Sequence, residues 1–326
     1  QGLWNPVRSA KEGYNNSSNK RFTSIFTGSY TWKGLKYNSL FSYEYESGIS
    51  SRYRPHTTAF NNSGVKVMDD QFAELTEGFS SAENIQVDNY ITYDKSFYEQ
   101  HKLSILVGHS FLDNKYANRS AFGRDIPSNF LQILNASSAS TQRAYGSKNR
   151  NTLQSFFGRI NYNFQEKYLL EGNIRYDGSS RFSQEERYGL FPSFSVGWRV
   201  SEEDFLKENQ VIDNLKFRAS LGTLGNQGIG NYAYVSSYSV GTPYLVNGEL
   251  VNGAAITDLG NESIKWEETK TANFGLDLSL LNSLELTFDY FNKNTNNMLV
   301  RLPIPLTLGG LGAPYQNIGE VQNKGW

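Results

Sequence analysis

The sequence predicts an all-β protein that forms part of a transmembrane antiparallel β-barrel. Apolar and polar residues alternate along nearly the whole chain of 326 residues, which is the period of a β-strand. The alternating runs are roughly 10–13 residues long, and a tilted strand needs about 9–11 residues to cross a membrane. The links between the runs alternate between short and long. Outer-membrane barrels combine these three features, whereas a soluble sandwich has no reason to sort its links by length.

The alternation is clearest at 168–200, YLLEGNIRYDGSSRFSQEERYGLFPSFSVGWRV. In its first run Leu170 and Ile174 lie on one side and Glu171 and Arg175 on the other. The second run repeats the pattern as far as Val200. Each run therefore predicts a strand with one apolar and one polar face. The apolar faces must either pack on each other in a soluble core or contact lipid.

The other runs predict about nine further strands in the same way. The predicted strands in chain order cover 22–32, 35–45, 85–93, 103–111, 156–164, 168–177, 188–200, 215–221, 274–280 and 284–290, with a short last strand that starts near Ile318.

The lengths of the links favour the membrane reading. Short links lie at 33–34, 95–100, 165–167 and 281–283, and long ones at 47–82, 112–150, 224–264 and 295–315. Every second link lies on the same rim of an antiparallel sheet, so one rim carries most of the loop mass. In outer-membrane barrels the short turns are periplasmic and the long loops are extracellular, and we expect that orientation here.

Composition excludes several classes of protein. No window approaches 18 consecutive apolar residues, so helical membrane spans are excluded. The formal net charge of −1 gives no electrostatic footprint for nucleic acid. Cysteine is absent, which excludes disulfides and thiolate metal sites in this chain. We expect no cofactor.

Two features fit the barrel pattern less well. Pro192 lies inside a predicted strand, where it removes a hydrogen-bond donor from the ladder. The link 201–213 is long for a periplasmic turn, and its SEEDFLKEN predicts a short helix capped by Ser201 with Asp204 at the third helical position.

Catalytic and metal-binding patterns are weak. His101 and His109 share a strand face but lie roughly 26 Å apart, so they do not bind one metal ion, and His56 stands alone. The acidic run 202–204 fits the first turn of a helix better than the carboxylate pair of a glycosidase. The glycine-rich stretch 222–231 lacks the Lys-Ser/Thr of a phosphate-binding loop. We therefore expect no catalysis, no metal ion and no catalytic residue.

The sequence suggests roles for other polar and aromatic residues, and for some of them several roles stay open. Aromatic residues near strand ends suit the interfacial girdles of a barrel, namely Trp32, Tyr168, Tyr176 and Trp198. Loop aromatics either stack on sugar rings or pack the loops themselves, namely Tyr232, Tyr234, Tyr238 and Tyr244. Polar residues of the inner face either line a solute path, hold a plug or are simply solvated, namely Arg159, Arg175, Asp177, Arg218, Asp277 and Asp289. The sequence does not identify which residues bind substrate.

Six stretches in order resemble the SusC/RagA family of TonB-dependent outer-membrane transporters. They are SFFGRINYNFQEKYLLEGNIRYDGSSRF, GLFPSFSVGWRVSEEDFL, LKFRASLGTLGNQGIGNY, IKWEETKTANFGLDLSLL, LTFDYFNKNTNNML and NIGEVQNKGW. The resemblance is dense over about 150–326 and weaker over 20–150.

The resemblance implies a barrel of about 22 strands with an N-terminal plug in the outer membrane of a Gram-negative bacterium. It implies import of glycans, oligosaccharides or peptides, energised through TonB, with a SusD-like surface lipoprotein as a partner. We expect residues 1–326 to be part of a single barrel domain, about 11 strands of it, without the plug and the terminal strands. The segment QGLWNPVRS does not read as a natural start, which fits a mature or excised piece.

Two alternatives stay open. The chain could be a soluble, secreted β-rich module that binds carbohydrate or acts as an adhesin. A β-sandwich glycosidase is a third class, but it lacks a convincing pair of carboxylates.

Overall fold

The computed structural model describes residues 13–61, 63–70 and 72–326, so the segment QGLWNPVRS lies outside the described residues. Eleven strands form one sheet in the order β1-β2-β5-β6-β7-β8-β9-β10-β13-β14-β15. Their bounds are β1 Tyr14–Trp32, β2 Leu35–Arg54, β5 Glu74–Phe97, β6 His101–Arg124, β7 Arg143–Phe164, β8 Tyr168–Ser179, β9 Tyr188–Arg199, β10 Ile212–Asn226, β13 Glu267–Leu280, β14 Leu284–Arg301 and β15 Tyr315–Gly325. The prediction of an all-β sheet of about eleven strands is confirmed.

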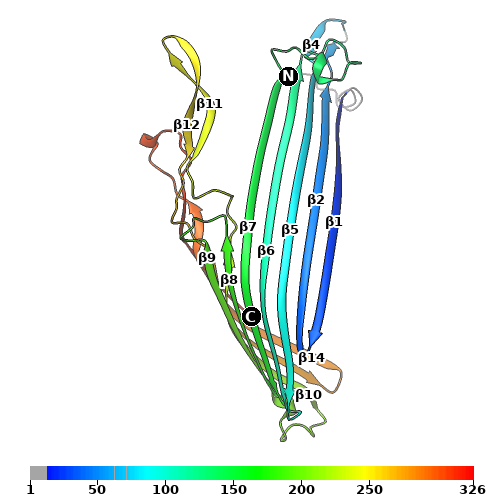
Figure 1. Cartoon of the computed structure of the whole chain (residues 1–326), viewed down its shortest axis with the longest axis vertical. Coiled ribbons are helices and arrows are strands. Elements are labelled where there is room, and N and C mark those ends of the chain that lie inside the picture. Colours follow the sequence, from blue (N-terminus) through cyan, green and yellow to red (C-terminus); the bar gives the residue numbers. More distant parts are fainter. Residues whose placement is uncertain (1–12, 62, 71) are drawn as a thin grey trace. The chain divides into compact units, whose positions relative to one another are not determined.

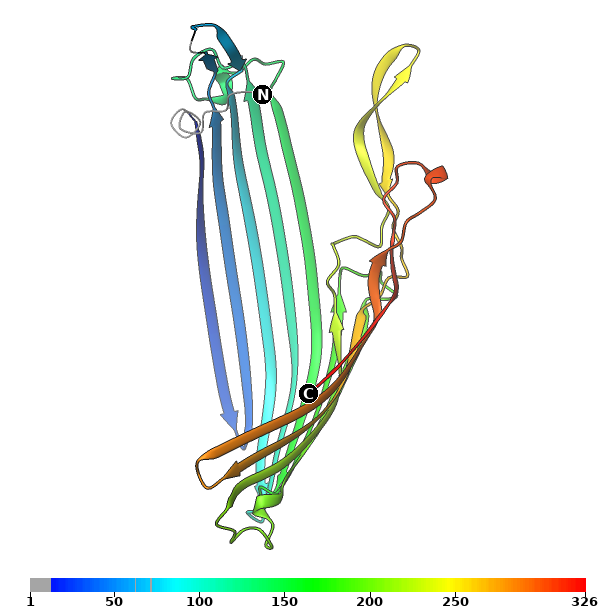
Figure 2. The same cartoon turned by 180° about the vertical axis from the view of Figure 1, so that it is seen from behind.

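Two small hairpins accompany the sheet, and the sequence analysis missed both. Strands β3 (Thr57–Phe60) and β4 (Lys66–Asp70) pair within the predicted loop 47–82. Strands β11 (Ser237–Val246) and β12 (Glu249–Asp258) pair within the predicted loop 224–264. Figures 1 and 2 show the second hairpin in yellow. Both hairpins consist of short strands, and each lies inside a stretch that the link pattern assigned to a single long loop.

The chain divides into two compact units. The first comprises the described residues up to Ile25 together with Ser42–Ile85 and Asp113–Arg150. The second comprises Phe26–Phe41, Gln86–Leu112 and Asn151–Trp326. Strands β1, β2, β5, β6 and β7 each contribute residues to both units.

The predicted strand length is wrong for the first five strands of the sheet. Strands β1, β2, β5, β6 and β7 have 19, 20, 24, 24 and 22 residues, against the expected 10–13. The added residues come from segments such as Ser47–Arg54 and Glu74–Asn84, which are rich in Ser, Glu, Arg and Asn. Because apolar residues are sparse in these segments, the period of two could not be read from them.

The first unit holds the polar parts of these long strands. Arg150 on β7 donates two hydrogen bonds to the carboxylate of Asp113 on β6, at 2.8 and 2.9 Å. Lys115 binds Glu83 on β5 at 2.7 Å. A small buried cluster of Tyr53, Ala73, Leu75 and Ile126 closes the unit. Cross-strand ion pairs and backbone ladders therefore hold most of this unit.

The register of the second unit confirms the predicted faces. Tyr168 pairs with Trp198, Trp198 with Phe217, Phe217 with Leu276, and Leu276 with Phe288. These five residues form a row across β8, β9, β10, β13 and β14, which we call the aromatic row. Paired residues lie on the same face of a sheet, so one face of these strands is apolar and the other polar.

None of the residues that the structure describes covers the apolar face. Leu170, Ile174 and Phe194 are 41%, 49% and 54% exposed, although they belong to the most apolar part of the sheet. A soluble sandwich would bury these side chains under a second sheet. The structure therefore decides the question raised by the 168–200 stretch against a packed core.

Pro192 lies where β9 is paired on one side only. Pairing between β9 and β10 runs from Arg199 to Ser193 and stops there, whereas on the other side Pro192 pairs with Ile174 of β8. Proline is tolerated in strands at such positions, which resemble the edge of a sheet. Among the described residues, no helix is both long enough and apolar enough to cross a membrane.

Candidate functional site

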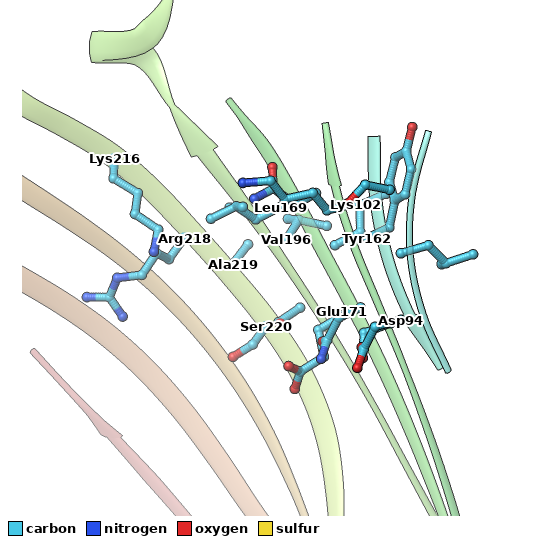
Figure 3. A pocket seen from close by; sticks show the side chains of 18 of the residues that line it. Asp94, Lys102, Tyr162, Leu169, Glu171, Val196, Lys216, Arg218, Ala219 and Ser220 are labelled. Carbon is cyan, nitrogen blue, oxygen red and sulfur yellow. The ribbon is translucent and has the colours of Figure 1, made fainter. Parts of the chain in front are cut away.

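The polar face of the second unit carries an open groove of about 600 Å³, which we call the polar groove. Its lining comes from seven strands, β5 to β10 and β13 (Figure 3). The polar lining residues are Asp94, Lys95, Ser96, Lys102, Ser104, Asn161, Asn163, Glu171, Ser195, Lys216, Arg218, Ser220 and Asn273. Alternation explains the set, because they are mostly the residues between the apolar positions of each strand.

Arg218 is the centre of the charged part of this face. It donates to both oxygens of Asp277, at 2.8 and 2.9 Å, and lies 3.2 Å from Asp289. The three side chains come from the adjacent strands β10, β13 and β14 and are 32%, 28% and 40% exposed. Sequence analysis proposed all three as inner-face residues, and the structure brings them together.

The other proposed inner-face residues also lie on the polar face. Arg175 binds Asp177 at 3.0 Å and donates to Ser155 at 3.1 Å. Arg159 pairs with Asn173 in the register of β7 and β8, and its side chain is exposed. These residues are spread over the face, so the structure supports a charged, solvated wall more than a single compact site.

A second polar cluster lies beside the short turns, at the edge of the sheet that we call the turn rim. Tyr168 donates its hydroxyl hydrogen to Oε1 of Glu203 at 2.7 Å, and Trp198 Nε1 donates to the same oxygen at 3.1 Å. Lys167 Nζ lies 3.3 Å from Oε2 of Glu203 and 3.3 Å from Asp204. We call Lys167, Tyr168, Trp198 and Glu203 the rim cluster.

The rim cluster has consequences for the charge of Glu203. The hydrogen bond from Tyr168, followed by that from Trp198, lowers the pKa of the Glu203 carboxyl below its ordinary value of 4.5. The carboxylate therefore stays charged at neutral pH. It holds the link 200–211 against Tyr168, the first residue of β8, and Trp198, the next-to-last residue of β9.

The predicted helix at SEEDFLKEN is wrong. Val200–Glu202 form a single 3-10 turn, followed by further turns, and Arg199 takes the cap position without a side-chain hydrogen bond. The Ser201 hydroxyl is buried without a hydrogen-bond partner. The acidic run thus does not serve a helix dipole, because Glu203 and Asp204 bind Lys167 on the preceding turn instead.

A buried core, which we call the loop core, lies at the ends of β8 and β9 that are opposite to the turn rim. It contains Phe182, Phe191, Ile229, Ile264 and Trp266, with Leu299 and Tyr315 packed against it. Trp266 Nε1 donates to the carbonyl of Arg187 at 2.9 Å, so the indole is both packed and hydrogen-bonded. Five of the six stretches quoted above supply a residue to this core.

The sixth stretch, NIGEVQNKGW, joins the same region through Asn317. Its side chain accepts from the backbone N–H of Lys265 at 2.9 Å and donates to the carbonyls of Lys265 and Asn297 at 2.8 and 2.7 Å. The quoted stretches are therefore close in space because they build one structure. The sequence analysis used the aromatic residues of this core only as part of the alternating pattern. It did not predict that they pack together.

The histidines have structural contacts, in line with the sequence analysis. Nδ1 of His101 lies 2.6 Å from the hydroxyl of Tyr162, and Nε2 of His109 lies 3.1 Å from Nε2 of Gln154. Within residues 13–61, 63–70 and 72–326, no group of three metal-binding side chains comes together. Of the loop aromatics, Tyr234 packs against the loop core, whereas Tyr232, Tyr238 and Tyr244 are 51–64% exposed.

Comparison with known proteins identifies the family. Residues 2–326 match the family described as TonB dependent receptor-like, beta-barrel. The chain is 35% identical over 328 residues to TonB-dependent receptor P3 of Formosa agariphila, which is 99% of this chain and 32% of that protein. It is 35% identical over 248 residues to TonB-dependent receptor SusC of Bacteroides thetaiotaomicron, which is 74% of this chain and 24% of that protein.

Solved structures agree with these matches. The chain resembles the RagAB peptide transporter with a TM-score of 0.86 and 26% identity, over 97% of this chain and 34% of that one. It spans about a third or less of the length of these relatives. The resemblance to the SusC/RagA family drawn from the six stretches is confirmed, and the chain belongs to the TonB-dependent receptor-like β-barrel family.

Proposed function

We propose that this chain forms part of the wall of an outer-membrane transporter that imports glycans, oligosaccharides or peptides. One observation carries the proposal, namely an apolar face that runs uncovered over consecutive strands and is opposed by a polar, charged face. In a membrane barrel the first face contacts lipid and the second lines a water-filled interior.

We further propose that residues 1–326 belong to one barrel domain of a longer protein in the outer membrane of a Gram-negative bacterium. The support is that curated relatives are about three times as long as the chain they match. The plug and the remaining strands of about 22 would then belong to other parts of that protein. The short turns at the turn rim would face the periplasm and the long loops the outside.

The partners and substrate class follow from the relatives and remain proposals. The similarity to SusC and RagAB supports a SusD-like surface lipoprotein as a partner and TonB as the source of energy. The RagAB structure is that of a peptide transporter, which favours peptides, whereas the resemblance to SusC leaves glycans equally open. Transport of this kind requires no catalytic residue and no cofactor in the wall.

A soluble, secreted carbohydrate-binding or adhesin module is the weaker candidate. Such a module would have to leave residues such as Phe217 and Phe288 in water, at 47% and 55% exposure, across several strands. Contiguous apolar surfaces of this kind are rare on soluble monomers. The exposed aromatic residues of the β11–β12 hairpin are the only feature that would suit sugar binding, within the residues described here.

Uptake by cells tests the proposal. A strain that lacks the full-length gene should lose growth on one class of glycan or peptide, and a tonB deletion should cause the same loss. Complementation with the gene should restore growth only when TonB is present. A full-length protein that fractionates with secreted soluble proteins, or uptake that is independent of TonB, would contradict the proposal.

A further inference from the structure

The apolar face carries a distinct hollow of about 510 Å³ next to the turn rim, which we call the apolar groove. It extends across β8, β9, β10, β13 and β14. The volume falls within the roughly 300–1,000 Å³ of sites that hold small molecules.

The sequence of the five strands explains the hollow. Leu170 pairs with Val196, Val196 with Ala219, Ala219 with Phe274, and Phe274 with Tyr290. Ala219 and Val196 are the smallest side chains of this row, and the next row towards the turn rim is the bulky aromatic row. Small residues flanked by large ones leave a depression, with Ala219 at its floor and Trp198 and Phe217 as one wall.

The groove changes from apolar to polar at one end. Tyr168 and Trp198 line it and also donate their only polar hydrogens to Glu203 of the rim cluster. Aromatic residues with one apolar and one polar side mark the boundary between hydrocarbon and headgroups. Arg218 contributes no charge to the groove, because its guanidinium binds Asp277 on the opposite face.

We propose that the apolar groove is a binding site for one acyl chain of a phospholipid, whose headgroup lies at the level of the rim cluster. The inference rests on the proposed function, which places this face in the membrane. Two observations select the occupant: the groove is continuous with the exposed apolar face, and its boundary at the turn rim is polar. The site would take a phospholipid of the leaflet on that side.

A photoreactive lipid tests the site. The full-length protein is placed in nanodiscs that contain phosphatidylethanolamine with a diazirine on one acyl chain, and crosslinked peptides are mapped by mass spectrometry. Labelling should concentrate on β9, β10 and β13 around Ala219 rather than on the equally exposed Ile174 and Leu190. Uniform labelling of the whole apolar face would reject the site and would indicate a general lipid annulus only.

Ala219→Phe should fill the groove and reduce labelling there by roughly fivefold or more, which corresponds to about 1 kcal/mol of lost binding. Ala272→Phe is the matched control, because Ala272 lies on the same face of β13 but outside the groove. Folding is checked by the folded band on an unboiled gel, and Val196→Phe replaces Ala219→Phe if that variant does not fold. Unchanged labelling in a folded, filled variant would overturn the proposal.

TonB-dependent uptake is measured with the same variants. If the wild type takes up substrate but shows no concentrated labelling around Ala219, only the proposal of the lipid site fails. A wild-type protein that does not enter nanodiscs contradicts the proposed function instead, so the two failures are distinguishable.

Discussion

Single side chains in this structure fix where chain segments begin and end. Glu203 accepts hydrogen bonds from Tyr168 and Trp198 and an ion pair from Lys167, and these three contacts replace the helix that its surroundings predicted. The sequence signal for these contacts is a carboxylate that follows a tryptophan near the end of a strand by five residues. Its partners could not be read, because Tyr168 lies 35 residues away along the chain.

Glu203→Gln should weaken the turn rim in a pH-dependent way. The pKa of Glu203 is lowered in the folded protein, so its carboxylate stabilises the fold at neutral pH and loses this effect as the pH falls below its ordinary value of 4.5. Thermal unfolding of the full-length protein in detergent, followed by tryptophan fluorescence, should show a wild type more stable than the variant at pH 7. The difference should shrink towards pH 3, and a difference that does not depend on pH would contradict the role of the charge.

Trp266→Ala should destabilise the loop core. The change removes a buried indole that packs on Phe182 and Phe191, with ring centroids 5.2 Å away in both cases, and leaves the carbonyl of Arg187 without its donor. Substitutions of this kind cost about 3–5 kcal/mol. Urea denaturation of the full-length protein measures the loss, with Tyr238→Ala on the exposed hairpin as a control that should cost little.

Strands were predictable as elements wherever one face is apolar. Alternation identified all eleven strands of the sheet and the faces of residues such as Leu276 and Asp277. It failed for the polar parts of β5 and β6, where apolar residues are sparse, and for the β11–β12 hairpin, which lies inside a stretch that the link pattern assigned to one long loop. The inner-face residues were predictable by alternation, but the loop core was not, because its residues come from loops whose path depends on tertiary packing.

Leu276→Arg and Asp277→Asn test the two faces of β13. A charge on the lipid side costs roughly 2–4 kcal/mol at mid-membrane and less towards the interfaces, so Leu276→Arg should destabilise the full-length protein by up to that amount. Asp277→Asn weakens its ion pair with Arg218, but Arg218 keeps Asp289 and both groups are partly solvated. Its cost should therefore be about 1 kcal/mol or less. The urea concentration at which the folded band disappears from an unboiled gel compares the two variants, and equal sensitivity would show that Leu276 does not contact lipid.

At the scale of the whole molecule, sheet order and link length together support the proposed orientation. Neighbouring strands in the sheet follow the chain, so successive links alternate between the two rims. The links 55–73, 125–142 and 227–266 share one rim, and the turns 33–34, 98–100, 165–167 and 281–283 share the other. The predicted sorting of links by length is confirmed, although the links 55–73, 125–142 and 302–314 are shorter than the predicted 47–82, 112–150 and 295–315.

Single cysteines test the orientation in a full-length protein that is otherwise free of cysteine. Ala139→Cys lies in the link 125–142, and Glu208→Cys lies in the link 200–211 at the turn rim, and both side chains are exposed. A membrane-impermeant maleimide on intact cells should label the first variant only, and both after lysis. Labelling of Glu208→Cys on intact cells would reverse the orientation.

The unequal lengths of the strands affect how this protein can vary during evolution. In the shorter strands β8 and β9 an insertion of one residue would turn every following side chain to the wrong face, so only paired insertions preserve the pattern. In the polar parts of β5 and β6 polar residues predominate on both faces, and a single inserted residue largely exchanges one polar surface for another. Changes of length among relatives should therefore accumulate in these polar parts and in the loops they carry, while the apolar parts keep a constant length.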